Sequence, residues 1–199
     1  AEARVHYEAA ARDFASIPVC AERAKNGLLT CPDYFPLDAG RTWVYVDSES
    51  KGKAMRLDWE VRASSGTSGV IQTTLYAGNR RVRSVSETYD KRDWAVWRVE
   101  GKDAEALLRY PYTLGQNWTA KRGKTKLSYE IVAVDVVVKV AAGEFKDVLK
   151  VREVDSRFPQ TWRYDYYAPG VGRIKTALAG KGYENPNAEL SRYDGGMLK

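Results

Sequence analysis

Strict alternation of apolar and polar residues is the feature that most limits the fold of this chain. Across residues 55–62, Met, Leu, Trp and Val alternate without a break with Arg, Asp, Glu and Arg. Successive side chains of a β-strand point to opposite faces, so the pattern predicts a strand with one buried and one wet face. The same period recurs from residue 33 onward, except in residues 101–108, where we expect a short helix or a connection, and in residues 180–187, where we expect a loop. We expect a mainly β fold: a curved antiparallel sheet, or an open or partly closed barrel, of about ten strands.

Two breaks in this period predict irregular strands. Apolar residues occupy odd positions over residues 127–131 and even positions over residues 134–140, so the phase changes at Ala133. The alternation also slips near Ser84. A one-residue slip would turn every following side chain to the wrong face unless a β-bulge absorbs it. We therefore predict a bulge or bend at both places.

The first 32 residues follow a helical pattern. Apolar residues at i, i+3, i+4 and i+7 predict one face of a short helix; they are Tyr7, Ala10, Ala11 and Phe14. Proline cannot continue a helix, so Pro18 is expected to end it. Residues 20–26 fit a second helical turn, with Gly27 just past its end. We expect an N-terminal helical segment over residues 1–32, packed on a β domain over residues 33–199.

Cysteine and histidine are too scarce for the common metal sites. The chain has two cysteines, Cys20 and Cys31, and one histidine, His6, whereas a structural zinc site needs four such ligands. We expect no metal and no cofactor. The cysteines either form a disulfide that closes a short loop or remain two separate thiols. The aromatic-rich β composition is typical of exported proteins, which occupy oxidising compartments, and it favours the disulfide.

The size of the chain sets broad limits on its class. At 199 residues it is long enough for one domain with a sizeable core. Its longest apolar run, residues 132–140, is far shorter than the ~20 residues that a membrane-spanning helix needs, so we expect no membrane span. Position 1 is Ala rather than Met. This fits a mature chain whose signal peptide was removed, and equally a chain cut at that point.

The sequence offers few groups for catalysis. Because His6 is the single histidine and lies in the helical segment, a Ser-His-Asp or Cys-His arrangement in the β domain is excluded. Neither a glycine-rich dinucleotide motif nor a phosphate-binding P-loop is present. Paired carboxylates remain, since Asp58 and Glu60 share one strand face and two carboxylates can hydrolyse glycosides. Arg56 and Arg62 flank them, however, as on the wet face of an ordinary strand. We expect a non-enzymatic protein.

Basic residues cluster around residues 80–83 and 121–126, and the net charge is +6. Cations beside many aromatic residues can bind single-stranded nucleic acid. No motif of a nucleic-acid-binding fold accompanies them, and lysines also protect exposed strand edges from pairing. We expect a solvated hairpin tip at residues 121–126 and no nucleic-acid partner.

The chain is rich in aromatic residues, with 6 tryptophans and 13 tyrosines. Such residues can line the concave face of a curved sheet and hold an apolar ligand, or they can fill the core and leave no cavity. Both alternatives stand at this point. The residues that we predict to line a ligand site are Trp43, Trp59, Trp97, Trp118, Trp162, Tyr164 and Tyr166.

The pattern Pro-x3-Gly-x2-Trp occurs twice in the β domain. Its fixed residues are Pro36, Gly40, Trp43, Pro111, Gly115 and Trp118. Each copy predicts a turn started by proline, a glycine free to adopt positive φ, and a tryptophan at a sheet end. The offset divides the domain into residues 34–109 and 110–185, which is consistent with an internal duplication. Other turn residues that we expect to be architectural are Gly143, Phe145, Pro169, Gly170 and Gly172.

Three longer motifs occur in the order CPDYFPLDAGRTWVY, VAAGEFKDVLKVRE and YYAPGVGRIK. Through them the chain, over about residues 33–180, resembles a widespread family of exported bacterial proteins of unknown function, many of them lipoproteins. The resemblance implies a long, curved antiparallel sheet similar to the open barrel of lipoprotein carriers, and it brings no catalytic residues. It also implies a location in the bacterial periplasm or cell envelope.

The sequence supports three functional hypotheses, which differ in how strongly the residues favour them. The preferred one is a non-enzymatic cell-envelope protein that binds an apolar ligand, or another envelope component, in an aromatic-lined concavity. The second is a structural or assembly module that holds a protein partner through a sheet edge or the basic turn. The third is a glycan hydrolase that uses Asp58 or Glu60.

Overall fold

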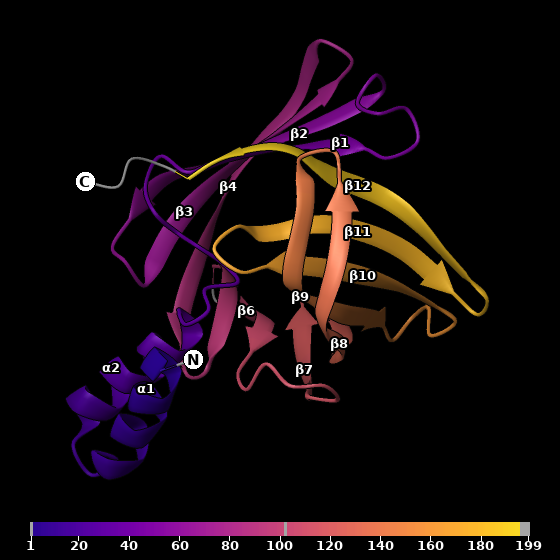
Figure 1. The fold of residues 1–199 in the computed structure, drawn as a ribbon. Helices are drawn as coiled ribbons and strands as arrows, with labels where there is room; N and C mark the ends of the chain where they lie inside the picture. Colours follow the sequence, from indigo (N-terminus) through magenta and orange to yellow (C-terminus); the bar gives the residue numbers. More distant parts are fainter. Residues whose placement is uncertain (1, 102, 196–199) are drawn as a thin grey trace.

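The computed structural model describes residues 2–101 and 103–195. Two helices, α1 (Glu2–Asp13) and α2 (Pro18–Leu29), precede a region that is almost entirely β-structure (Figure 1). The first six strands are β1 (Thr42–Asp47), β2 (Met55–Ser64), β3 (Ser68–Ala77), β4 (Arg80–Arg92), β5 (Ala95–Glu100) and β6 (Asp103–Arg109). The second six are β7 (Asn117–Arg122), β8 (Thr125–Val140), β9 (Gly143–Asp155), β10 (Thr161–Ala168), β11 (Gly172–Gly180) and β12 (Tyr183–Asp194). The predicted mainly β class with an N-terminal helical segment is confirmed; residues 196–199 of the predicted β domain lie outside the described residues.

The strands form one antiparallel sheet that curves into a nearly closed barrel (Figure 1). Each strand pairs with its neighbours in sequence from β1 to β6 and from β7 to β12, and β12 pairs back with β1. The sheet therefore has β6 at one end and β7 at the other. Within the described residues no hydrogen-bonded ladder joins these two strands, although they lie side by side.

The sheet has twelve strands rather than the ten predicted, because two weakly alternating segments pair after all. Residues 103–108, predicted to be a short helix or a connection, belong to β6 and pair with β5 across a bulge. Residues 183–187, predicted to be a loop, begin β12 and pair with β11, although their side chains are exposed. A bulge disrupts the two-residue period, and a strand without a buried face shows none. Backbone pairing between strands requires neither a regular two-residue period nor a buried face.

Both irregularities predicted from the sequence are confirmed. Strands β8 and β9 shift register at Ala133, and nearby Asp135 adopts a φ of 55°. In the β3–β4 hairpin the ladder skips Val82, which lies two residues from Ser84. These bulges allow each strand to keep its apolar residues on one side of the sheet although the sequence changes phase.

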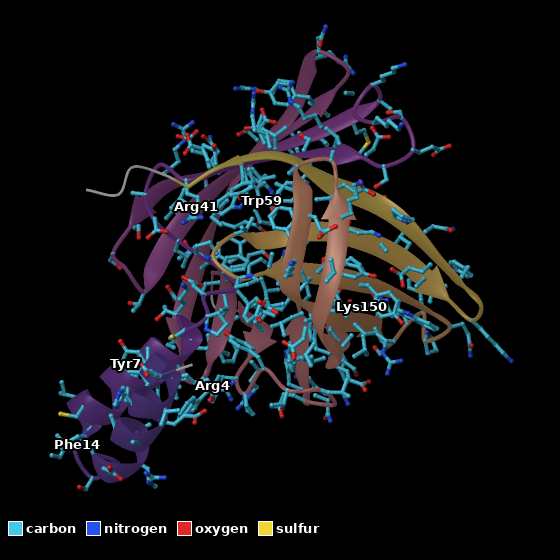
Figure 2. The ribbon with its side chains drawn as sticks, viewed as in Figure 1. Arg4, Tyr7, Phe14, Arg41, Trp59 and Lys150 are labelled. Carbon is cyan, nitrogen blue, oxygen red and sulfur yellow. The ribbon has the colours of Figure 1, made fainter. Side chains whose placement is uncertain are left out.

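The helical segment is a hairpin of two full helices that projects from one end of the barrel (Figure 1). Pro18 lies in the first turn of α2, where its missing N–H removes no intrahelical bond. The second helix continues to Leu29 and so contains Gly27, which was predicted to lie just past its end. The ring of Tyr7 lies so close that a Cβ at Gly27 would come within 2.4 Å of it. Phe14, in the turn after α1, is largely exposed (Figure 2). Neither helix of the described chain has the length and apolar character to cross a membrane.

The structure contradicts the predicted disulfide, since Cys20 and Cys31 are both free thiols. Cys20 lies in the first turn of α2, and Cys31 lies just beyond its last residue. At 1.5 Å per residue, the helix between them separates the two positions by roughly 16 Å, whereas bridged cysteines have Cα atoms within about 7 Å. The continuous helix thus excludes the bridge that a short loop would have allowed.

Residues 33–41 form a strap that closes one end of the barrel. Phe35 packs between two inward-facing aromatic residues, with ring centroids 5.0 Å from Tyr89 and 6.5 Å from Tyr167. The hydroxyl of Tyr34 donates a hydrogen bond of 2.9 Å to the backbone carbonyl of Asp147 in β9. The strap is therefore fixed to strands of both halves of the barrel.

The Pro169–Gly172 turn holds the strap from the other side. Its two glycines adopt φ values of 71° and 95°, a region that glycine enters without strain. Arg41, labelled in Figure 2, donates a hydrogen bond of 2.8 Å from Nη1 to the carbonyl of Gly170. The indole Nε1 of Trp43 donates one of 2.7 Å to the carbonyl of Val171. The turn thus fixes the start of β1 to the start of β11.

The two copies of Pro-x3-Gly-x2-Trp adopt the same local structure. Gly40 and Gly115 have φ values of 80° and 81°. The amide of Gly40 donates to the carbonyl of Val61 at 2.9 Å, and the amide of Gly115 donates to that of Ile131 at 2.8 Å. Each copy therefore starts the first strand of a six-stranded half, β1 or β7. The duplication itself stays a prediction.

The β8–β9 hairpin docks its turn on β12. Gly143 in this turn has a φ of 137°. The amide of Ala142 donates a hydrogen bond of 2.9 Å to the carbonyl of Leu190. The ring of Phe145 lies 6.0 Å from that of Tyr193. Figure 1 shows the hairpin crossing β10 and β11 to reach this position.

Candidate functional site

The inward faces of β5 to β9 carry a connected set of charged residues. Glu105 on β6 accepts hydrogen bonds of 2.6 and 3.0 Å from Arg122 on β7, and it also pairs with Arg98 on β5. The hydroxyl of Tyr129 on β8 lies between Glu105 and Glu153, 2.9 Å from the latter. Arg122 reaches Glu153 as well, at 3.1 Å. These groups form one hydrogen-bonded network in the barrel interior.

The network continues onto β10 and β11. Arg163 donates hydrogen bonds of 2.7 Å to Glu153 and 2.8 Å to Asp165. Nη1 of Arg173 lies 3.7 Å from Oδ1 of Asp165, and its guanidinium lies over the ring of Trp59, 4.4 Å from the centroid. Buried charges are tolerated when they are paired and hydrogen-bonded. The arginines of this network meet that condition for each carboxylate.

Burial and ion pairing fix the protonation states in the network. Burial alone would raise the pKa of Glu105, but hydrogen bonds from Arg122 and Tyr129 outweigh it and lower that pKa below its ordinary value. Burial raises the pKa of Tyr129 and of Tyr167, and nearby carboxylates add to the effect. At neutral pH the network thus contains an ionised Glu105, charged guanidiniums and protonated tyrosine hydroxyls.

A cavity of about 180 Å³ lies in the barrel beside this network. The volume corresponds to roughly six water molecules at ~30 Å³ each. Its apolar and aromatic wall is formed by Phe35, Leu57, Trp59, Tyr89, Leu107 and Tyr167. Its polar wall is formed by Thr73, Glu87, Arg98, Arg122, Arg163 and Arg173. The cavity therefore combines an aromatic surface with guanidinium groups.

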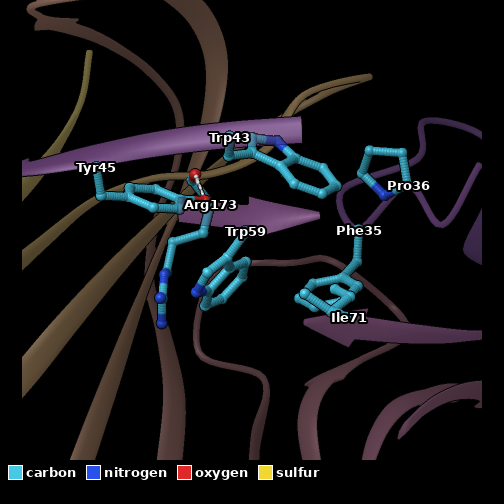
Figure 3. Close-up of a pocket in the computed structure, with 8 residues that line it drawn as sticks. Phe35, Pro36, Trp43, Tyr45, Trp59, Ile71 and Arg173 are labelled. Carbon is cyan, nitrogen blue, oxygen red and sulfur yellow. Dashed lines mark hydrogen bonds between the residues drawn. The ribbon is translucent and has the colours of Figure 1, made fainter. Parts of the chain in front are cut away.

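A much smaller gap of about 10 Å³ lies between the strap and strands β1, β2 and β11 (Figure 3). It is at the lower limit for a single water molecule. Trp43 and Tyr45, which line it, are 3% and 2% exposed, so both are core residues. Phe35, Trp59 and Arg173 line this gap as well as the cavity and lie between the two.

Three of the seven residues predicted to line a ligand site point into the barrel. Trp59 lines the cavity, whereas Trp43 fills the core beside the strap. Trp118 stacks on Tyr129 with ring centroids 5.3 Å apart. Its indole Nε1 donates a hydrogen bond of 2.8 Å to the carbonyl of Ala106. The structure thus brings these three tryptophans inside but places only Trp59 at the cavity.

Three of the other four predicted residues lie on the outer face of the sheet; they are Trp97, Trp162 and Tyr164. Tyr166 follows the same side of β10 but is buried, with 6% of its surface exposed, and its hydroxyl donates a hydrogen bond to Glu184. The ammonium of Lys150, labelled in Figure 2, lies 3.9 Å from the ring centroid of Tyr164. The guanidinium of Arg152 lies 5.9 Å from the ring of Trp162. Cations on β9 thus cover the aromatic rings of β10. None of the four lines the 180 Å³ cavity, but Trp162 lines a separate pocket of about 390 Å³ together with Phe158, Leu178 and Tyr183.

The carboxylates considered for glycan hydrolysis lie on the outer face of β2. Asp58 accepts a hydrogen bond of 2.9 Å from Arg56, and Glu60 lies 3.0 Å from Arg62. Both pairs are partly exposed, as on the wet face of an alternating strand. Among residues 2–101 and 103–195, no group of three or more His, Cys, Asp and Glu residues is arranged to hold a metal ion.

Sequence reasoning missed the charged interior. On β10 it assigned the aromatic residues to the inside, but the inward face holds Arg163 and Asp165. The basic cluster at residues 121–126 was likewise predicted to be solvated, whereas Arg122 turns inward to Glu105. A usable signal was Glu153, a charged residue in phase with the apolar inward residues that precede it on β9.

Comparison with known proteins shows similarity at the level of structure. No protein-family model matches this sequence, and no curated protein is significantly similar to it. A crystal structure from Bacteroides fragilis, of a protein assigned as exported with a YmcC-like fold, matches with a TM-score of 0.57 and 16% identity, covering 80% of this chain and 98% of that one. A protein from Parabacteroides distasonis, assigned as a lipoprotein, matches with a TM-score of 0.54 and 11% identity, covering 81% and 98%. At these identities the likeness is one of fold, and the chain therefore shares the fold of these two bacterial proteins.

Proposed function

We propose that this protein is a non-enzymatic component of the bacterial cell envelope that binds one end of an amphipathic molecule inside its barrel. The observation that carries the proposal is the interior cavity of about 180 Å³, with an aromatic wall and a polar wall. Ligand sites in proteins are typically concave and mostly apolar, with a few polar groups that fix orientation. A cavity of this size accepts a short chain or one end of a longer one.

The polar groups of the interior favour binding over catalysis. A general base works best when its pKa lies near the working pH, whereas the pKa of Glu105 is lowered. Its oxygens are already engaged by Arg98, Arg122 and Tyr129. His6 lies on α1, outside the barrel. These groups can hold a ligand in place but are poorly arranged to move protons.

An envelope location is supported by the two structural neighbours. One is assigned as an exported protein and the other as a lipoprotein. A barrel with an internal cavity suits a protein that shields the apolar part of an envelope molecule from water. The proposal therefore names amphipathic envelope molecules as the ligand class.

Filling the cavity provides a direct test. Thr73 on β3 lines the cavity, and Thr73→Phe would occupy much of it. The wild type and the variant are incubated with a total lipid extract from a Gram-negative bacterium and measured by native mass spectrometry. We expect a one-to-one adduct on the wild type that is absent from the variant, because the inserted ring takes the place of the ligand.

The neighbouring threonine supplies a matched control. Thr74 points to the outer face, where its hydroxyl lies 3.2 Å from that of Ser84, so Thr74→Phe adds the same ring outside the barrel. We expect this variant to keep the adduct. An adduct that persists in Thr73→Phe, or that is absent from the wild type, contradicts the proposal. Thermal unfolding of both variants checks that the added ring costs no more than the ~1–3 kcal/mol typical of overpacking.

The alternative of a protein partner bound at a sheet edge receives less support. Strand addition requires an edge whose backbone groups are accessible. The two ends of this sheet, β6 and β7, lie against each other, and Trp118 on β7 donates its indole hydrogen bond to the backbone of β6. A partner strand would have to displace that contact.

A further inference from the structure

The polar wall of the cavity presents positive charge to its interior. Four of its six members are arginines and one, Glu87, is a carboxylate. The remaining carboxylates of the network lie behind the arginines: Glu105, Glu153 and Asp165 keep only 3%, 8% and 4% of their side-chain surface exposed. The side chains of the four arginines keep between 18% and 36% of their surface exposed. A molecule entering the cavity therefore meets four guanidinium groups and one carboxylate, that of Glu87.

Of the four arginines that line the cavity, Arg173 is the one without a side-chain hydrogen bond to a carboxylate of the described residues. Its Nε has no hydrogen-bond partner among the described residues. Its Nη1 lies 3.7 Å from Oδ1 of Asp165, which is too long for a hydrogen bond, and that oxygen also lacks a partner. Arg163, by contrast, holds Asp165 and Glu153 at 2.8 and 2.7 Å. A buried guanidinium with spare donors is costly unless something accepts from it.

Two further groups that can donate also line the cavity without partners. The indole Nε1 of Trp59 and the hydroxyl of Thr73 are buried and unpartnered among the described residues, and both residues line the cavity together with Arg173. Trp59 is 91% buried, being 9% exposed. An indole N–H can only donate. The wall thus offers donors from three strands, β2, β3 and β11, to one cavity.

We propose that the cavity recognises the anionic oxygen group, a carboxylate or a phosphate, of an amphipathic ligand, with Arg173 as its principal contact. The inference rests on the proposed function, since it names the end of the molecule that enters the barrel. Guanidinium groups present donors in a fixed fork that matches carboxylate and phosphate oxygens. Phe35, Tyr89 and Tyr167, which also line the cavity, then contact the apolar part next to the charged group.

A cationic ligand fits the same cavity less well. It would need a carboxylate with free lone pairs, but Glu105 and Glu153 already accept from Arg122 and Tyr129. Glu87 is the more exposed acid, and it accepts from Arg98 and Tyr89. The unpartnered groups on residues that line the cavity, those of Arg173, Trp59 and Thr73, can all donate, and acceptor-rich groups complement them.

The test compares four probes by isothermal titration calorimetry at pH 7: hexanoate, hexyl phosphate, 1-hexanol and inorganic phosphate. Hexanoate is ionised at this pH and matches 1-hexanol in chain length. We expect hexanoate or hexyl phosphate to bind the wild type about 10- to 100-fold more tightly than 1-hexanol, the range for hydrogen bonds to charged groups. This comparison uses the wild type alone and does not depend on any variant folding.

Two arginine variants test which residue causes the preference for the anionic probes over 1-hexanol. Arg173→Gln removes the charge inside the barrel, and we expect it to reduce the preference for the acid over the alcohol to less than about threefold. The matched control is Arg56→Gln, because Arg56 also lies over an aromatic ring, that of Tyr76 at 4.1 Å, but on the outer face. We expect the control to keep the full preference. An unchanged preference in Arg173→Gln overturns the assignment of that residue.

The four probes separate failure of this inference from failure of the proposed function. If 1-hexanol binds as tightly as hexanoate and hexyl phosphate, the cavity binds amphipathic molecules but the anion site is wrong. If none of the three hexyl probes binds, the proposed function is wrong, and the inference falls with it. Inorganic phosphate that binds as tightly as hexyl phosphate supports the anion site but identifies free phosphate, rather than an amphipathic molecule, as its occupant.

Discussion

The barrel contains two junctions between its six-stranded halves, and they are closed in different ways. At the β1–β12 junction the backbones pair from Thr42 opposite Asp194 to Asp47 opposite Ala188, with one bulge. At the β6–β7 junction no such ladder forms among the described residues, and side chains make the connection. Yet both β1 and β7 begin with the same Pro-x3-Gly-x2-Trp turn.

This difference shows that an identical strand start does not determine how the next junction closes. Each tryptophan donates an indole hydrogen bond to a backbone carbonyl outside its own strand. Trp43 donates to Val171, in the turn before β11, and Trp118 donates to Ala106 on β6. Only the β1–β12 junction adds a backbone ladder. The β6–β7 junction relies on Glu105 and its arginines instead, and therefore depends on ionisation and packing in a way that a backbone ladder does not. The next three experiments test that dependence.

The largest effect is expected from removing Glu105. Glu105→Ala leaves Arg98 and Arg122 without the carboxylate that they share, inside the barrel. Breaking a buried ion pair by deleting one partner typically costs about 3–5 kcal/mol. We expect the free energy of unfolding, measured in urea, to fall by that amount.

An outer-face pair provides the control for this substitution. Glu130 pairs with Arg152, and both side chains are more than one-third exposed. Exposed pairs contribute about 0–1 kcal/mol, so Glu130→Ala should change stability little. Equal losses in the two variants would show that Glu105 is no more important to the fold than a surface acid.

A smaller effect is expected from the two indole hydrogen bonds. Trp118→Phe and Trp43→Phe each remove one bond to a backbone carbonyl and some packing, at a cost of about 1–3 kcal/mol. Hydrogen exchange should distinguish them. We expect Trp118→Phe to increase amide exchange in β6 and β7 selectively, because that junction has no ladder to hold it, whereas Trp43→Phe should leave β1 and β12 protected. Equal local opening at both junctions would mean that the backbone ladder adds nothing.

The smallest effect is expected from pH. The pKa of Glu105 is lowered in the folded protein from 4.5, so its ionised form stabilises the fold. That contribution is fully present above about pH 4.5 and is lost as the pH falls through the folded-state value. We expect the stability difference between wild type and Glu105→Gln to narrow on acidification from pH 7 to pH 3 in urea titrations. A difference that stays constant across this range would show that the charge of Glu105 does not support the junction.

The sequence predicted where the strands lie better than which side of each strand faces the interior. Alternation located the strands, and the phase change at Ala133 correctly predicted a register shift in β8 and β9. Alternation reports that two faces exist but does not report which one is inside. On β10 Trp162 and Tyr164 lie outside under Arg152 and Lys150, while Arg163 and Asp165 lie inside. The inward charges are acceptable only because partners from other strands neutralise them, and a local pattern does not contain those partners.

The candidate site was predictable only in part, because some of its residues depend on partners from other strands. Trp59 was identified from its place in a half-buried strand, and it does line the cavity. Arg173 was not identified, although it directly follows Gly172, a predicted turn residue of the YYAPGVGRIK motif. Its role depends on Asp165 and Trp59, which approach it only when β2, β10 and β11 are assembled. Residues whose roles arise from distant partners are the ones that a single sequence conceals.

The unpaired junction between β6 and β7 also has a consequence for how such a barrel can change over evolutionary time. Inserting a hairpin anywhere else would break an existing ladder and force its neighbours to find new registers. Between β6 and β7, where no ladder joins the described strands, a hairpin could be gained without separating two paired strands. The molecule thus carries one natural place for growth, and related barrels with more strands would be expected to have widened there.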